Sequence, residues 1–299
     1  MELRVRQRAE SLRAFKIRAT IVHVACLGVF FVPVTRELLI AAALGFFIRV
    51  FSWEIGSHRY FSHRSFKTSR AFQFVMAVLA AASGQRGVLW WAEHHRRHHR
   101  HADRHPDDLH SPVLHSLWQA HFGWLLSQDA LDTDLESVRD LTRFPELVWI
   151  NKYHYFFPLG LLILTFLVGQ YTALFGSTGL GLAALVWVFF VSMVLSQQSA
   201  FSLNTAMHGV KPSWFNTRRY PTPDSTTNMW LLAIPTLGAA WHNNHHRYMT
   251  SARAGFYWYE LDLGYLILRL LALLHIVWDL NPVPDDVIAE GRGGPVAAG

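Results

Sequence analysis

Four apolar segments, arranged as two pairs, dominate the hydrophobic pattern of the chain. The first pair covers residues 18–34 and 38–53, and the second covers residues 155–174 and 180–199. Only Thr35-Arg36-Glu37 divides the first pair, and a short turn with Gly176 and Gly179 joins the second. A helix needs roughly 20 apolar residues to cross a bilayer, and short connections make antiparallel neighbours. We therefore expect an all-α protein with four transmembrane helices in two hairpins.

Two further apolar stretches are interrupted by polar residues. Residues 71–91 contain the break Ser83-Gly-Gln-Arg-Gly87, and residues 264–278 contain Arg269 and His275. Both patterns predict helices that lie in the membrane interface or cap the bundle. The segment 281–299 is rich in Pro, Gly and Ala, so we expect a frayed tail. Because there is no internal repeat, residues 1–299 are expected to form a single integral-membrane domain.

Composition and charge support this interpretation and orient the chain. The sequence is 51% hydrophobic and 16% charged, against about 25% charged in ordinary soluble domains. Lys and Arg concentrate in the N-terminus, in residues 59–152 and after Lys211, whereas the two short turns hold only Arg36. The positive-inside rule then places both termini and the helical cap in the cytosol. No basic stripe with interleaved aromatic residues accompanies the net charge of +6, so nucleic acid is not an expected partner.

Three histidine-rich motifs lie just outside the apolar segments. They are His58-Arg-Tyr-Phe-Ser-His63, His95-Arg-Arg-His98-His99 and His242-Asn-Asn-His245-His246. At about 100° per residue, positions i, i+3 and i+4 of a helix share one face, and the adjacent pair diverges enough to reach two metals. Asn204 and His208, four apart, also share a face. Eight imidazoles exceed what one metal uses, so the motifs predict a dinuclear centre.

The first motif departs from helical spacing. His58 and His63 are five residues apart, about 140° around an ideal helix. Their rings converge only where the helix is distorted or ends, so we expect a helix terminus there. One such motif among 18 histidines would be a weak signal, but three beside apolar segments favour a structured site. In the second motif, spacing alone leaves His94 as an alternative to His95.

Several quoted segments together resemble one family. They are Gly56-Ser-His-Arg-Tyr-Phe-Ser-His63, Trp91-Ala-Glu-His-His-Arg-Arg-His-His99, Asp108-Leu-His-Ser-Pro112, His121-Phe-Gly-Trp-Leu125 and Trp241-His-Asn-Asn-His-His246. The chain resembles the membrane fatty acyl desaturases, most of all the bacterial delta-9, acyl-CoA-type branch. The resemblance implies a metal-ligand set that includes His95 through the register of Trp91, with Asn204 acting through water: His58, His63, His95, His98, His99, His208, His242, His245 and His246.

The resemblance also implies the reaction and its partners. Two iron ions would use O2 to introduce a cis double bond, at delta-9, into a saturated fatty acyl chain in the bacterial inner membrane. Hydrogen removal from an unactivated methylene is beyond side-chain acids and bases, so it requires a redox metal. A separate ferredoxin, rubredoxin or cytochrome b5 type of donor, with its reductase, would supply two electrons. Two departures from relatives are Gly238-Ala-Ala-Trp241 before the last motif and Glu93-His94 where animal relatives carry Arg-Asp.

Other expectations concern the surroundings of the metals. Candidate carboxylates that orient the imidazoles are Glu54, Asp103, Asp107 and Asp262. Candidate tunnel walls are Trp90, Trp91 and Trp241. Acyl-CoA is favoured over acyl-lipid, with these basic residues as candidates for binding it: Lys67, Arg70, Lys211, Arg218 and Arg219.

Two alternatives stay open at this stage. A hydroxylase, ketolase or alkane monooxygenase of the same histidine-motif kind would share the metal site but add oxygen. A metal transporter would instead need several ionisable groups within the spans, where only His23 and Arg49 occur.

Overall fold

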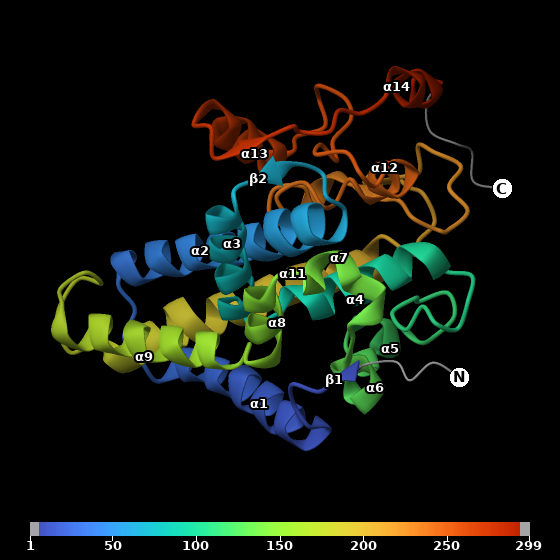
Figure 1. Ribbon diagram of the computed structural model, residues 1–299. Helices are drawn as coiled ribbons and strands as arrows, with labels where there is room; N and C mark the ends of the chain where they lie inside the picture. The colour runs from blue at the N-terminus through green and yellow to red at the C-terminus, as the bar shows by residue number, and fades with distance from the viewer. Residues whose placement is uncertain (1–5, 294–299) are drawn as a thin grey trace.

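The computed structural model describes residues 6–293, which form a predominantly helical protein (Figure 1). The α-helices are α1 (Leu12–Ala25), α2 (Arg36–Phe51), α3 (Arg70–Ala82), α4 (Val88–His101), α5 (Leu117–His121), α6 (Gln128–Leu131), α7 (Arg139–Thr142), α8 (Pro145–Lys152), α9 (Phe156–Tyr171), α10 (Gly181–Ala184), α11 (Ser192–Ala206), α12 (His242–Arg247), α13 (Leu263–Leu273) and α14 (Asp285–Gly291). The 3-10 segments are η1 (Cys26–Phe30), η3 (Gly123–Leu126), η4 (Glu136–Val138) and η6 (Trp230–Leu232), and the π-helical segments are η2 (Ser52–Ser62) and η5 (Leu185–Val191).

Short antiparallel strand pairs tie distant parts of the chain together. They are β1 (Arg6–Gln7) with β3 (Thr133–Asp134), β2 (Lys67–Thr68) with β6 (Val277–Trp278), and β4 (Asn216–Thr217) with β5 (Asn228–Met229). These pairs hold the loops of the cap in place, whereas the long elements are helices.

The longest helices agree with part of the predicted membrane topology. Arg36–Ser62 and Gly181–Ala206 are each long and apolar enough to cross a membrane. The pair Pro145–Lys152 and Phe156–Tyr171 qualifies only if its two helices, bent by 69°, count as one span. The first predicted segment falls on α1 and η1, which are not among these helices. Two or three candidate spans are thus present, and the four-span arrangement stays a prediction.

Local sequence explains where these helices begin and which faces they expose. The Ser11, Thr35 and Ser69 hydroxyls each accept a hydrogen bond from a backbone N–H three residues on, at 3.2, 3.1 and 3.2 Å. Such caps satisfy amides that lack an intrahelical partner. Along α1, α2 and α9, large apolar side chains such as Ile21, Leu44 and Leu164 are exposed. An apolar surface of this extent suits a lipid environment.

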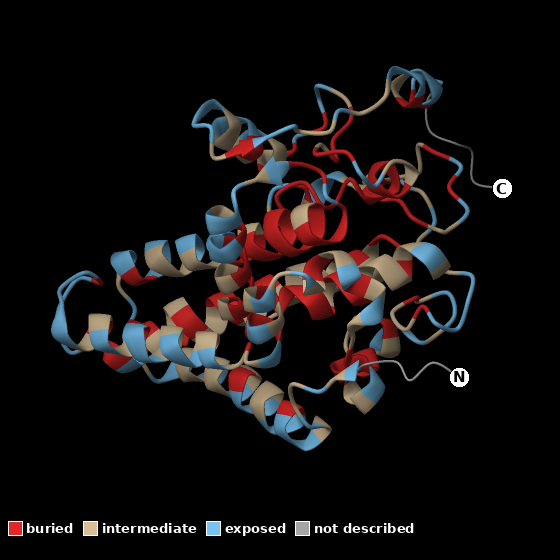
Figure 2. Ribbon diagram, in the orientation of Figure 1, coloured by how far each residue is buried: buried red, intermediate tan, exposed pale blue. Residues whose placement is uncertain are grey.

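Buried residues concentrate at one end of the long helices, where η2, α4 and α12 lie close together (Figure 2). α3 packs against η2, α8 and α9 and buries Met76, Ala77 and Ala81, so it belongs to the core rather than lying on the surface. α13 buries Gly264 and Leu268 and exposes Leu266 and Leu270, as expected of an amphipathic capping helix. The Ser83–Gly87 break separates α3 from α4.

The expectation of a frayed tail is wrong for residues 281–293. α14 forms there, and Val287 is buried while its carbonyl accepts a 3.1 Å hydrogen bond from the Tyr220 hydroxyl. Arg247 and Glu290 form an ion pair, with the Arg247 Nε 2.9 Å from Glu290 Oε2. These contacts join segments far apart in sequence, which composition alone does not reveal. The remainder of the predicted tail, residues 294–299, lies outside the described residues.

Candidate metal centre

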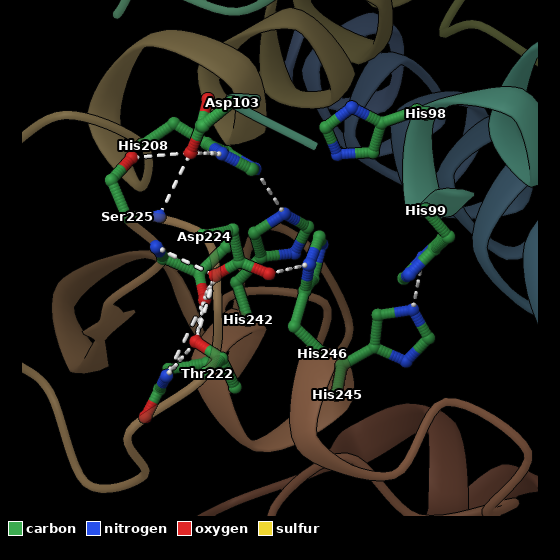
Figure 3. Close-up of polar contacts among 12 residues, drawn as sticks. His98, His99, Asp103, His208, Thr222, Asp224, Ser225, His242, His245 and His246 are labelled. Carbon is green, nitrogen blue, oxygen red and sulfur yellow. Dashed lines mark hydrogen bonds and ion pairs between the residues drawn. The ribbon is translucent and has the colours of Figure 1, made fainter. Parts of the chain in front are cut away.

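Nine histidine side chains converge into two groups in the buried end of the fold. Figure 3 shows six of them: His98, His99, His208, His242, His245 and His246. The five-histidine group consists of His58, His63, His95, His99 and His245. The four-histidine group consists of His98, His208, His242 and His246. Within each group, one ring nitrogen of every member lies within 4.8 Å of the others. The structure therefore brings together all nine histidines of the predicted ligand set.

The spacing of the ring nitrogens suits a metal ion in each group. Nε2–Nε2 distances are 2.9 Å for His58 and His245, 2.8 Å for His63 and His95, and 3.0 Å for His208 and His242. Two nitrogens bound about 2.1 Å from one ion and at right angles lie about 3.0 Å apart. Imidazole nitrogen is a good ligand for iron, copper, nickel and zinc. The residues present therefore fit two metal ions.

A π-helix explains the unusual spacing of the first motif. In η2 the backbone N–H of His63 donates to the carbonyl of His58 at 3.2 Å, an i→i+5 hydrogen bond. Residues five apart then fall on one face, and the rings of His58 and His63 lie 5.0 Å apart. His63 also caps the helix. Both expected devices, a distortion and a helix end, are present.

The adjacent histidines of the other motifs divide between the groups, as their spacing predicts. His99 of α4 and His245 of α12 belong to the five-histidine group, and their neighbours His98 and His246 belong to the four-histidine group. The rings of His99 and His246 are 4.3 Å apart, so the two groups touch. Two metal ions bound in these groups would lie close together, as the predicted dinuclear centre requires.

Carboxylates fix the orientation of four of these rings. In each of the four, Nδ1 lies within hydrogen-bond distance of a carboxylate oxygen. The pairs are His58 with Glu54 at 2.7 Å, His98 with Asp108 at 2.9 Å, His208 with Asp103 at 2.9 Å and His246 with Asp224 at 2.8 Å. Each carboxylate can accept a hydrogen bond from the Nδ1–H group, which leaves the Nε2 lone pair for a metal. Figure 3 shows the Asp103–His208 and Asp224–His246 pairs.

Only some of the carboxylates predicted to orient the histidine rings do so in the structure. Glu54 and Asp103 contact ligands, and Asp262 acts one step away by binding Arg59, which also binds Glu54. Asp107 does not take part, because it is exposed and lies near His105. Asp108 and Asp224 were not predicted. Asp108 lies in a quoted motif, ten residues after its histidine; Asp224 lies in a loop without a recognisable pattern.

Burial favours the neutral, metal-binding form of the rings in the five-histidine group. It lowers the pKa values of His95, His99 and His245 well below 6.5, so their rings are neutral near pH 7. His98 of the other group differs: burial alone would lower its pKa, but the neighbouring Asp108 carboxylate raises it above 6.5. Burial alone would raise the pKa of Asp103, but hydrogen bonds from His208, Ser111 and Ser225 hold it below its usual range. Neutral imidazoles and ionised carboxylates are the forms that bind and orient at a metal.

A cavity of about 80 Å³ opens against the two groups. Its lining includes His58, His95, His98 and His242, together with Asn204. Asn204 donates from Nδ2 to the Ala120 carbonyl at 3.3 Å and lines the same cavity as His242. Its contact with a metal through water stays a prediction.

Two of the three tryptophans predicted to form tunnel walls line the cavity, and the third does not. Trp90 and Trp91 line the cavity. Trp241 is not among its lining residues: it packs with Ala233 and Ala254, and its indole N–H donates to the Leu261 carbonyl at 2.8 Å.

Most of the basic residues considered for acyl-CoA binding have partners. Lys67 pairs with Asp279 at 2.9 Å, and Arg70 pairs with Glu146 at 2.8 Å. Arg218 donates to the backbone carbonyls of Thr222, Asp224 and Thr226, and Arg219 pairs with Glu260 at 3.3 Å. These four cations already have partners within the chain, so their sequence positions alone do not mark a carrier site.

Comparison with known proteins agrees with the geometry. The fatty acid desaturase family matches residues 5–277. A hex-5-enoyl-[acyl-carrier protein] acetylenase of Moorena producens is 34% identical over 80% of this chain and 74% of its own. An sn-1 stearoyl-lipid 9-desaturase of Synechocystis is 27% identical over 84% of this chain and 79% of its own. An acyl-CoA C20 Delta5-desaturase of Anemone leveillei is 30% identical over 89% of this chain and 80% of its own.

The two histidine groups lie beside a cavity with aromatic walls, and the family match covers most of the chain. The chain therefore belongs to the fatty acid desaturases, which are oxidoreductases of lipid metabolism that act on acyl chains.

Proposed function

We propose that this protein is an O2-dependent di-iron desaturase that introduces a cis double bond, at delta-9, into a saturated fatty acyl chain. The observation that carries the proposal is the pair of touching histidine groups on the wall of a cavity lined by Trp90 and Trp91. When bound, iron would supply the oxidising power that removes two hydrogens from an unactivated carbon–carbon bond.

The chain itself contributes ligands, orientation and exclusion of water. The nine histidines would hold the two irons, and Asn204 would reach one of them through water. Glu54, Asp103, Asp108 and Asp224 hold ligand rings in the required tautomer. The buried aromatic walls keep bulk water from the reacting methylenes, and each methylene taken out of water contributes about 0.8 kcal/mol to binding.

Relatives bear on the acyl carrier and on the double-bond position. The two 9-desaturases of Synechocystis and Anabaena variabilis act on stearoyl lipids, and the Anemone relative acts on acyl-CoA. Acyl-CoA, which the sequence favours, is the first carrier to test, and acyl-lipid is the second because four of the five candidate cations are already engaged.

The remaining partners follow from the chemistry. Reduction of O2 to two waters takes four electrons, and the substrate supplies two of them. A separate donor of the ferredoxin, rubredoxin or cytochrome b5 type, with its reductase, would supply the others. We place the site and both termini in the cytosol of a multi-pass protein, supported by the basic residues outside the apolar segments.

Desaturation is tested with purified, iron-loaded enzyme, a reduced donor and O2. Stearoyl-CoA and a stearoyl phospholipid are offered in parallel, and product masses and double-bond positions are determined. The proposal expects a product lighter by two hydrogens. A product that has gained an oxygen atom would instead establish the hydroxylase alternative.

A further inference from the structure

The loop between α3 and α4 presents one side chain, Gln85, from a rigid turn. Gly84 and Arg86 on either side have φ values of +80° and +67°, and such a backbone is rare for a non-glycine residue. Arg86 is held by Glu10, 3.0 Å from its Nη1, and by the Leu131 carbonyl, 2.6 Å from its Nη2. Strained backbone that surrounding contacts stabilise is common at functional sites.

Gln85 lies where two cavities meet. One cavity contains the metal-facing histidines. The other has a mixed lining from α1, η3, α11 and the neighbouring loops. It includes the apolar side chains of Val22, Phe122 and Leu125 and the polar side chains of Arg18, His23 and Gln197. The two cavities share Gln85, Trp90 and Phe201. Because the Trp90 indole N–H donates to the Ala130 carbonyl at 2.8 Å, Gln85 is the shared residue with a polar group free for a substrate.

The neighbouring Trp91 decides which end of the Gln85 amide faces the cavities. The Trp91 indole nitrogen lies 3.5 Å from Gln85 Oε1, and an indole N–H can only donate. The amide nitrogen therefore points away from Trp91. This Nε2 is buried and has no hydrogen-bond partner among the described residues, which is an unfavourable state for a donor.

Trp91 also sets the position of Gln85 relative to the metals. Its ring centroid lies 4.8 Å from that of His95 and 5.9 Å from that of His58. Both histidines belong to the five-histidine group. Gln85 thus contacts the residue that packs on the five-histidine group, next to the place where the acyl chain would be oxidised.

We propose that Gln85 Nε2 donates a hydrogen bond to the carbonyl oxygen of the ester or thioester that carries the acyl chain, and so fixes which carbons face the metals. The proposal rests on the proposed desaturase function. The carbonyl is an acceptor that both carriers share, whereas the chain beyond it is apolar and offers no group that a hydrogen bond could hold in register. Gln85 is a positioning residue that fixes how far from the carboxyl end the double bond is introduced.

The test compares carbonyl and ether forms of one substrate in two variants. Gln85→Met keeps the size of the side chain and removes the donor. Gln73→Met is a matched control, because Gln73 is buried, accepts a 2.9 Å hydrogen bond from Tyr60 and has an unpartnered Nε2, yet lines neither cavity. The substrates are the stearoyl carrier that the wild type converts and its analogue with a methylene in place of the carbonyl.

Gln85→Met should lower kcat/KM for the carbonyl substrate roughly three- to tenfold, as expected for a lost hydrogen bond. It should also turn a single double-bond position into a mixture. With the ether analogue, Gln85→Met and wild type should perform alike, and Gln73→Met should keep the wild-type double-bond position with both substrates.

Two results would overturn the inference. One is a single, unchanged double-bond position together with an unchanged kcat/KM for the carbonyl substrate. The other is an equal loss on both substrates, which shows a purely structural role. If Gln85→Met fails to retain iron, Gln85→Glu, which keeps the acceptor for Trp91, is judged by the same criteria. A wild type that does not desaturate at all would refute the proposed function instead.

Discussion

The imidazole rings of His58 and His63 lie 5.0 Å apart although the residues are five positions apart in one helix. The π-helical turn of η2 makes this possible, because its i→i+5 hydrogen bonds put both residues on one face. The helix that carries His58 and is capped by His63, both of the five-histidine group, is also one of the two helices long enough to cross a membrane. The metal centre is therefore attached directly to a candidate span.

Removing a ligand from either group should abolish desaturation. His99→Ala acts on the five-histidine group and His246→Ala on the four-histidine group, and each leaves a metal without one nitrogen. The measurement is product formation by iron-loaded, membrane-inserted protein. His101→Ala is the control, since His101 is also on α4 but faces Asp107 and His105. More than a few per cent of wild-type activity in either ligand variant would contradict the assignment.

Asp224→Asn should weaken metal binding by about 10- to 100-fold, because the carboxylate that accepts the His246 Nδ1 proton is lost. Iron retention against a graded chelator gives the measurement. Asp107→Asn serves as the comparison, because Asp107 is exposed and contacts no histidine of either group. Equal iron retention by the two variants would argue against a role for Asp224.

Metal retention should decrease as the pH falls. Burial lowers the pKa of His246 to about 4 and those of His95 and His99 well below 6.5. A ring with a depressed pKa stays neutral, and available to a metal, until the pH falls towards that value. The five-histidine group should therefore keep its iron on dialysis from about pH 7.5 to 6 and lose it only at lower pH. The four-histidine group contains His98, whose pKa the Asp108 carboxylate raises, so it should release its iron first as the pH falls. Loss of both irons together near pH 6.5, the value for unshifted histidine, would contradict this prediction.

Both ends of the chain should lie in the cytosol. Basic residues flank the apolar segments on the side of the histidine motifs, and the connections within each pair hold only Arg36. Reporters fused to either terminus should score as cytosolic. A periplasmic score for one of them would require an odd number of spans.

The sequence correctly predicts which histidines come together, because local spacing decides which side chains share a helix face. His95, His98 and His99 share a face on any helix, and the same holds for the third motif. The π-helical form of η2 was foreseen only as a distortion, because residue spacing shows that a regular helix fails but not what replaces it.

Contacts between segments that are distant in sequence could not be predicted from the sequence. Asp224 finds His246 through the fold of an irregular loop, and α14 is stabilised by Tyr220 and Arg247, far from it in sequence. Trp241 adjoins a ligand in sequence but faces Leu261, because the chain turns at Gly238, where φ is +100°. Gln85 was visible only as part of a helix break; its place between two cavities required the structure.

The most direct measurement is the iron content of reconstituted protein, combined with Mössbauer spectra of the bound metal. Nine histidines in two touching groups predict two irons per chain, both in nitrogen-rich surroundings. A single iron per chain in fully active enzyme, or full activity with zinc alone, would contradict the di-iron desaturase.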